Sequence, residues 1–375
     1  MSVPFWKTIS PLRGLAMLAV VANHSIQMAP ASYLLGPEPL RPAEHPVAFG
    51  VMSVLRGLTP VALHLFLAVS GFVSFRFFRG PAESWATARV TLRKYLTWAV
   101  PLTLLLAVHE RHFDLEAMAL GLLVGGPMSA YWFLILIVML YGLAPWLVSG
   151  VKQHPKRMGA LAFGVQALTC AVFYARDGRA LGAMWLWPVV RCVQFLPFFL
   201  LGMWAARDAD VVGAWLAGHR HSIRAACVGL ALLAIAESAL ISQRHGFVIF
   251  PSGPMYALER VSMPLLSAAL LGWLCSVELK PAWLLHWLAQ VGTHSLGILL
   301  MMDLFHRFVI VSIWQLPRFV SAAAATAFAQ HQLPVVVTSH GLWLVPVFFV
   351  AGVWGPLYVI DWAHRLVGNR VRLLF

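Results

Sequence analysis

The first apolar segment of the chain reads Leu12-Arg13-Gly14-Leu15-Ala16-Met17-Leu18-Ala19-Val20-Val21-Ala22-Asn23-His24. Such a run predicts a membrane-spanning helix, and two of its side chains, Arg13 and His24, are ionisable. Ionisable groups at membrane depth are costly and rare, so each indicates a functional site. Their separation is about three helical turns, so the two side chains point within about 20° of each other and lie about 16 Å apart. The pattern predicts that Arg13 and His24 face one cavity together.

Each of these two residues also has a structural explanation. Arg13 alone fits a basic anchor whose long side chain reaches the cytoplasmic interface. His24 alone fits a buried histidine whose ring nitrogens are hydrogen-bonded within the fold. A shared stripe on one helix is explained better by a common site than by two independent structural roles.

Composition indicates that this helix belongs to a membrane protein. Apolar residues make up 60% of the 375 residues and charged residues 11%, whereas about a quarter of a soluble domain is charged. The formal net charge of +13 does not indicate nucleic acid, because the basic residues are scattered between apolar runs, as positive-inside topology requires. The four cysteines lack CxxC spacing and predict small core residues rather than a disulfide framework or a metal site. No bound cofactor is expected.

The apolar runs predict an all-α, polytopic membrane helix bundle with about ten transmembrane helices. A further apolar stretch, 117–126, is too short to cross and predicts a re-entrant or interfacial segment. Polar stretches are short, so residues 1–375 are expected to form one membrane domain with no separate soluble domain. The expected spans are 10–29, 51–75, 95–108, 130–149, 159–174, 188–206, 224–241, 255–276, 283–304 and 335–361.

Basic residues orient this predicted bundle. With both termini inside, sixteen Lys and Arg residues fall on the cytoplasmic side and seven outside, which favours an N-in, C-in topology. The remaining four of the 27 basic residues fall in or at the spans: Arg13, Arg56, Arg191 and Arg260.

Five segments, in order along the chain, resemble the acyltransferase-3 family of integral membrane O-acyltransferases. The first is Leu12-Arg13-Gly14 followed by His24, which is similar to that family's opening arginine–histidine signature. The others are His64-Leu65-Phe66-Leu67-Ala68-Val69-Ser70-Gly71-Phe72, Arg93 through Pro101, Tyr131-Trp132-Phe133-Leu134 with Tyr141 and Pro145, and Gln194-Phe195-Leu196-Pro197-Phe198-Phe199-Leu200-Leu201-Gly202-Met203.

A late segment departs from the family pattern. The run that starts at Ser295 resembles the family's "S..IYL.H" segment, but Leu299 stands at the tyrosine position and Met302 at the histidine position. Asp303 and His306 are near but out of register. This departure bears on the late histidine and on the identity of the acceptor, and leaves Arg13 and His24 untouched.

The resemblance implies an acyl-CoA-dependent acyltransferase of the bacterial cytoplasmic (inner) membrane. It moves an acyl group, usually acetyl, from acetyl-CoA or another acyl-CoA to a hydroxyl of a cell-envelope or secreted glycan or glycolipid. The expected partners are therefore the acyl-CoA co-substrate, a glycan or lipid-linked saccharide acceptor and membrane lipids. A sugar hydroxyl needs a positioned base, which makes His24 the candidate general base. Arg13 is the candidate donor-positioning cation, because a guanidinium binds phosphate through a fixed fork.

Four further residues are donor-binding candidates. Arg76 and Arg93 belong to a basic stretch that would attract polyanionic coenzyme A, although topology and lipid headgroup contact explain it equally well. Ser70 and Gly71 lie late in the second span, where glycine would let a pantetheine arm approach the backbone. A close contact between helices through small residues is the alternative for this pair.

Cavity-lining candidates are His64, Trp132, Glu259 and Arg260. His64 falls near the middle of its span and is expected to form a second polar wall. Trp132 also fits an interfacial aromatic belt, and Glu259 with Arg260 also fits a buried structural pair.

A transporter or flippase of lipid-linked saccharides is the alternative class. It too would need charges within the membrane and a cavity. The sequence lacks paired interrupted helices in matching halves, which would be the usual indication of a transporter site.

Overall fold

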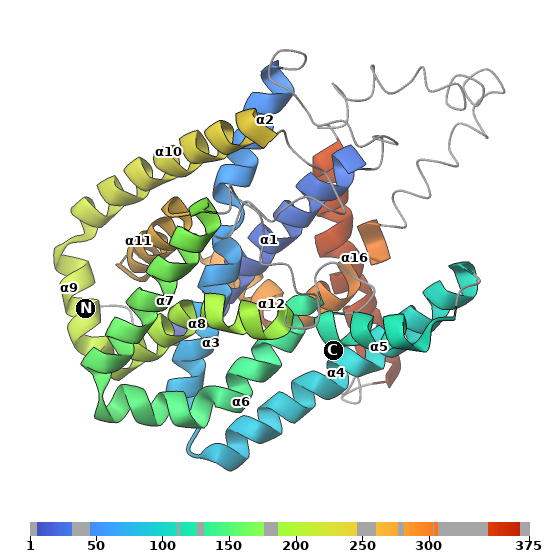
Figure 1. Ribbon diagram of the computed structural model, residues 1–375, viewed down its shortest axis with the longest axis horizontal. Coiled ribbons are helices and arrows are strands. Elements are labelled where there is room, and N and C mark those ends of the chain that lie inside the picture. The colour runs from blue at the N-terminus through green and yellow to red at the C-terminus, as the bar shows by residue number, and fades with distance from the viewer. Residues whose placement is uncertain are drawn as a thin grey trace.

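The computed structural model describes residues 6–31, 46–110, 113–125, 131–175, 187–245, 260–276, 281–302, 304–306 and 344–367. Every regular element in these ranges is an α-helix, as the composition predicts. The helices are α1 (Trp6–Ala31), α2 (Pro46–Leu58), α3 (Val61–Phe77), α4 (Pro81–Glu110), α5 (Leu115–Val124), α6 (Trp132–Gln153), α7 (Pro155–Ala175), α8 (Trp187–Arg207), α9 (Ala209–Gly218), α10 (Arg220–His245), α11 (Ser262–Ser276), α12 (Ala282–Thr293) and α16 (Leu344–Val367). In Figure 1, α1, α3 and α8 lie centrally, whereas α10 and α4 run along opposite sides.

Six helices in the described part of the chain are long and apolar enough to cross a membrane. A seventh is reached if α12 and Ser295–His306, which meet at a 65° bend, count as one span. The expected spans 10–29 and 95–108 lie in α1 and α4, which are long helices but are not among the six. The expected span 255–276 overlaps α11, which is a shorter apolar helix. The count of ten spans and the N-in orientation stay predictions.

The second expected span, 51–75, is confirmed as part of one candidate membrane span, Phe49–Phe77, which is interrupted at Thr59 and Pro60 between α2 and α3. Proline lacks the backbone N–H that the helix ladder needs, so the chain switches to shorter bonds at this point. Ala62 N–H donates to the Thr59 carbonyl at 3.2 Å and Leu63 N–H to the Pro60 carbonyl at 3.3 Å. The break turns the hydroxyl of Thr59 towards α1, where it lies 3.1 Å from Asn23 Oδ1.

Glycines allow the central helices to approach at backbone distance. A Cβ on Gly14 of α1 would lie 1.9 Å from the Leu288 carbonyl oxygen of α12. In the same contact, a Cβ on Gly292 would lie 2.1 Å from the Ser10 carbonyl oxygen. Small residues are the usual means by which membrane helices pack closely. Gly14 therefore ties the start of α1, with Arg13, to α12.

The α3–α8 contact uses the same device. A Cβ on Gly71 would lie 1.9 Å from the Phe199 carbonyl oxygen, and one on Gly202 would lie 1.8 Å from the Ala68 carbonyl oxygen. Helix α3 is buried along nearly its whole length, in keeping with a helix that is apolar all round. It forms the centre of the bundle, between α1, α8 and α11.

The short apolar stretch 117–126 falls in α5, a helix of ten residues. Asp114 caps its start by accepting a hydrogen bond from Ala117 N–H at 3.0 Å. Gly125 ends it with φ of 128°, a conformation that favours glycine. Ten residues of helix reach about 15 Å, half of a membrane core, so α5 does not cross.

Gly202→Ala is expected to lower the midpoint of thermal unfolding of the detergent-solubilised protein. The added methyl group would overlap the α3 backbone, and overpacking of this kind costs about 1–3 kcal/mol. Gly229→Ala on α10 is the matched control, because no atom lies within 4 Å of the place that its added methyl group would take. That variant should unfold at the wild-type midpoint or slightly above it. Equal midpoints for the two variants would contradict the glycine contact between α3 and α8.

Candidate active site

A cavity of about 60 Å³ lies between α1, α6 and the break that joins α2 to α3. Its walls are mostly apolar and include Met17, Leu63, Phe66, Phe133 and Leu299. Asn23, His24, Thr59 and Trp132 add the groups that form hydrogen bonds. Ligand sites commonly combine an apolar surface with a few convergent polar groups, and this cavity has that character.

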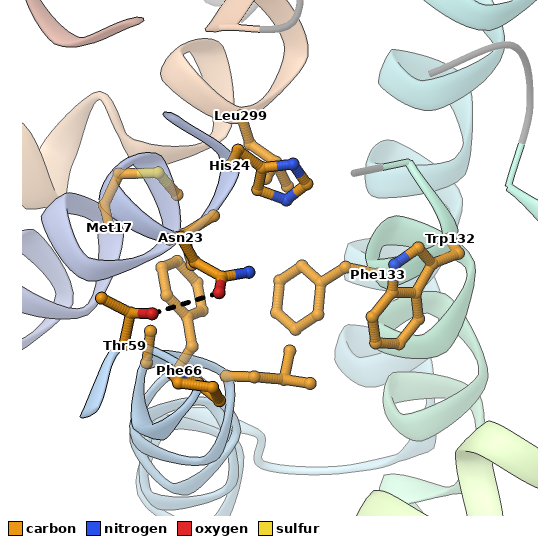
Figure 2. Close-up of a pocket in the computed structure, with 12 residues that line it drawn as sticks. Met17, Asn23, His24, Thr59, Phe66, Trp132, Phe133 and Leu299 are labelled. Atoms are coloured by element: carbon orange, nitrogen blue, oxygen red, sulfur yellow. Dashed lines mark hydrogen bonds between the residues drawn. The ribbon is translucent and has the colours of Figure 1, made fainter. Parts of the chain in front are cut away.

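His24 lies in the wall of this cavity, beside Leu299 (Figure 2). It is half-buried on α1, where the next two residues, Ser25 and Ile26, are fully buried on the other flank of the helix. Its imidazole therefore stands where a small molecule in the cavity would meet it. Spacing along α1 alone predicts such a position for His24.

Arg13 lies nearer the start of α1 and is also half-buried. Its Nη2 donates to the Ser295 hydroxyl at 3.0 Å, and its guanidinium carbon lies 5.8 Å from the centre of the Phe66 ring. Phe66 lines the same cavity as His24. Phe66 therefore contacts the Arg13 guanidinium and also lines the cavity, whereas Arg13 itself is not among the residues that line it.

Trp132 lines the cavity from α6, opposite α1 (Figure 2). The guanidinium carbon of Arg191, on α8, lies 5.6 Å from the centre of the Trp132 ring and 5.9 Å from that of Phe195. Arg191 is buried and donates to Gln194 Oε1 at 3.0 Å. A cation over a ring is attracted to its π face, so Arg191 fixes this wall from behind.

His64 does not line the cavity. It is buried where α3 meets α8 and α11, with its ring stacked on Phe198 at 3.9 Å between centres. Ser267 Oγ donates to the Met263 carbonyl at 2.6 Å, so it accepts the hydrogen bond from His64 Nδ1 at 2.9 Å. His64 joins three helices and has the surroundings of a structural histidine.

The four donor-binding candidates also lie apart from the cavity wall. Gly71 faces the α8 backbone, and Ser70 is buried one position earlier, where its carbonyl accepts from the Ser74 hydroxyl. Arg76 lies in the last turn of α3 and Arg93 lies on α4, and both are exposed. The contact of Gly71 therefore favours the alternative interpretation, a close packing of two helices through small residues.

Arg260 is buried just before α11 and binds two helix backbones. It donates to the Ala234 carbonyl at 3.1 Å and to the Arg56 carbonyl at 2.8 Å. Glu237 accepts hydrogen bonds from Tyr174 Oη and from both the N–H and the hydroxyl of Ser262. The sequence alone does not predict these partners. Glu259 lies outside the described residues, so its predicted pairing with Arg260 stays a prediction.

The late segment, whose Ser295 accepts from Arg13, comes near α1 again further along. Leu299 lines the cavity and Met302 is fully buried. His306 is also buried, with Nε2 3.0 Å from the Phe348 carbonyl of α16 and 3.4 Å from Ser25 Oγ. Asp303 lies outside the described residues.

Sequence reasoning missed Asn23 and Thr59. Asn23 is next to His24 in sequence but lies off the Arg13–His24 stripe, because adjacent residues on a straight helix point about 100° apart. The signal for Thr59 was Pro60, since a proline inside an apolar run indicates a helix break near the residue before it. Irregular backbone at membrane depth is tolerated only inside protein or beside a cavity, and Thr59 lies beside this one.

A comparison with known families matches a model described as an acyltransferase domain to residues 8–361. The chain belongs to the acyltransferase-3 family. This membership makes it a membrane acyltransferase, and the apolar helices agree with an integral membrane protein. No curated protein and no solved structure matches the chain.

Three of the five segments that carry the family resemblance contribute residues to the cavity wall. Phe66 comes from the α3 segment, and Trp132 and Phe133 come from the α6 segment. The α8 segment, Gln194–Met203, packs behind them against α3 through Gly202. Residues far apart in sequence therefore meet around His24.

Proposed function

We propose that this acyltransferase moves an acetyl group from a cytoplasmic acyl-CoA to a hydroxyl of a cell-envelope or secreted glycan or lipid-linked saccharide. The observation that carries the proposal is His24 in a small, mostly apolar cavity, with Arg13 on the same flank of α1 over Phe66. Its setting would be the bacterial cytoplasmic membrane, with membrane lipids around the bundle and acyl-CoA as a co-substrate.

His24 serves as the general base in this proposal. Its imidazole takes the proton of the acceptor hydroxyl while the hydroxyl oxygen attacks the thioester carbonyl carbon. A C–O bond forms and the C–S bond breaks, and the imidazolium returns its proton to the departing thiolate of coenzyme A. Imidazole suits both steps because it titrates near neutral pH. No acetylated enzyme needs to form.

Arg13 holds the donor in this proposal. Coenzyme A carries phosphates and amide carbonyls, and a guanidinium donates to both in a fixed planar geometry. Arg13 already donates to a neutral hydroxyl, that of Ser295, which a donor phosphate or carbonyl could replace as its partner. The exposed Arg76 and Arg93 would attract the polyanionic donor.

His24→Ala is expected to abolish thiol release from acetyl-CoA in the presence of an envelope extract as acceptor. Loss of a general base typically lowers the rate about 10²–10⁴-fold. The control is His154→Ala, an exposed histidine between α6 and α7, which should keep wild-type activity. Both variants should elute from a sizing column like the wild type. A His24→Ala rate within a few-fold of wild type would remove His24 from the base role. A wild-type protein that moves a saccharide unmodified, with no thiol release, would favour a transporter.

Arg13→Ala is expected to raise the KM for acetyl-CoA about tenfold or more, because a hydrogen bond to a charged group contributes about 1.5–3 kcal/mol. Arg13→Lys should fall between wild type and Arg13→Ala, since a point charge replaces the fork. Arg224→Ala, an exposed basic residue on α10, is the control for net charge. Steady-state kinetics with acetyl-CoA as the varied substrate give the measurement. An unchanged KM for Arg13→Ala would make Arg13 a topology anchor.

Donor and acceptor are expected to enter from opposite faces of the membrane. With both termini inside, Arg13 lies near the cytoplasmic face and His24 about 16 Å further along α1. Proteoliposomes of known orientation test this expectation, with acetyl-CoA on one side and acceptor on the other. Product should form when acetyl-CoA is on the cytoplasmic side and acceptor on the outer side. Product formed only when both are on the cytoplasmic side would contradict the crossing but not acyl transfer itself.

A further inference from the structure

The Asn23 side chain lies in the cavity wall beside His24, and its two ends face different ways. Its oxygen lies 3.1 Å from the Thr59 hydroxyl. Its nitrogen points into the cavity, towards Phe133 (Figure 2). An amide nitrogen is a donor only, so this end of Asn23 offers N–H groups to whatever fills the cavity.

Thr59 fixes this orientation from the helix break. Its hydroxyl lies 2.9 Å from the Leu55 carbonyl and 3.1 Å from Asn23 Oδ1, so its single proton is shared between two acceptors. Thr59 lies at the interruption between α2 and α3, next to Pro60. The contact joins α2 to α1 and keeps the Asn23 oxygen out of the cavity.

The apolar walls of the cavity strengthen the electrostatic effect of an amide donor. Its other walls are mostly side chains without hydrogen-bonding groups, such as Met17, Leu63 and Phe133. A preorganised N–H in an apolar, water-poor site stabilises a developing negative charge far better than it would in water. The basic group of the cavity, His24, is the next residue along α1, so base and donor face one small volume from adjacent positions.

We propose that Asn23 is a catalytic residue whose side-chain N–H binds the acyl carbonyl oxygen and stabilises the oxyanion formed on it, with Thr59 as its positioning residue. This inference rests on the proposed acyl transfer. When the acceptor oxygen attacks, the carbonyl π electrons move to oxygen, and Asn23 donates to that oxygen. When the electrons return, the C–S bond breaks and His24 gives its proton to the thiolate. The donor class is therefore a short acyl thioester, whose carbonyl enters between His24 and Asn23.

The kinetic test compares Asn23→Ala and Asn23→Asp with the wild type. Removal of one oxyanion donor typically costs about 10²–10³ in kcat. Both variants should lose kcat to this extent while the KM for acetyl-CoA changes little, because Arg13 is intact. Asn23→Asp keeps the size of the side chain but replaces the donor by an acceptor. Gln290→Ala removes an exposed amide from α12 and should retain wild-type kcat.

A second pair of variants, at Thr59, tests the positioning of Asn23 without changing Asn23 itself. Thr59→Ser retains the hydroxyl and should retain most of kcat, whereas Thr59→Val removes it and should lower kcat about tenfold at unchanged KM, as expected for loss of about one hydrogen bond. Equal kcat for Thr59→Val and wild type would overturn the positioning role.

The carbonyl stretch of bound acetyl-CoA reports the hydrogen bond directly. Carbonyl-labelled acetyl-CoA is bound to His24→Ala protein, which binds donor but should not turn over. The infrared band should lie at lower frequency there than in the His24→Ala/Asn23→Ala double variant. Bands at the same frequency, or an Asn23→Ala kcat within a few-fold of wild type, would overturn the inference. Wild-type protein that releases no thiol from acetyl-CoA would instead overturn the proposed function.

Discussion

A helix that breaks inside a membrane must satisfy the backbone groups it frees, and such breaks are tolerated only inside protein or beside a cavity. Two breaks in this chain contact α1. One is at Thr59 and Pro60, where the Thr59 hydroxyl meets Asn23. The other is the 65° bend after α12, where Ser295 meets Arg13. The two breaks lie against opposite ends of the Arg13–His24 stripe, so the backbone irregularities and the candidate functional residues form one arrangement.

Close glycine contacts hold this arrangement together. Gly14 lies one residue after Arg13 and lets α1 touch the α12 backbone, which brings Ser295 within reach of the guanidinium. Gly202 and Gly71 do the same between α8 and α3, which carries Phe66. A side chain at any of these glycines would separate the helices. The site therefore depends on backbone contacts that lie outside it, and sequence near the cavity explains only part of its geometry.

Spacing along one helix predicts a shared stripe for Arg13 and His24, because such a stripe depends only on helical geometry. In the structure His24 lines the cavity and Arg13 does not. Contacts between helices were beyond such reasoning. His64, like His24, is expected near the middle of a span, but α3 is buried all round, so periodicity could not tell which neighbour its imidazole would meet. Glu237 is similar: its partners Tyr174 and Ser262 come from α7 and the start of α11, and no local pattern connects them. The apolar run on both sides of Pro60 favoured one continuous span, and the structure has one span there, Phe49–Phe77, with a local interruption at Thr59 and Pro60.

The late departure from the family pattern acquires a physical meaning from these contacts. Leu299, at the family's tyrosine position, lines the cavity, so this position adds apolar surface where a phenol would add a hydroxyl. His306, out of register with the family's histidine, is buried against the Phe348 carbonyl and Ser25, with Gly352 of α16 leaving room for its ring. The hydrogen-bonding groups of the cavity wall therefore come from α1, Thr59 and Trp132 rather than from the late segment. The polar groups of this wall are therefore concentrated around Asn23 and His24, the two residues that the proposed mechanism uses.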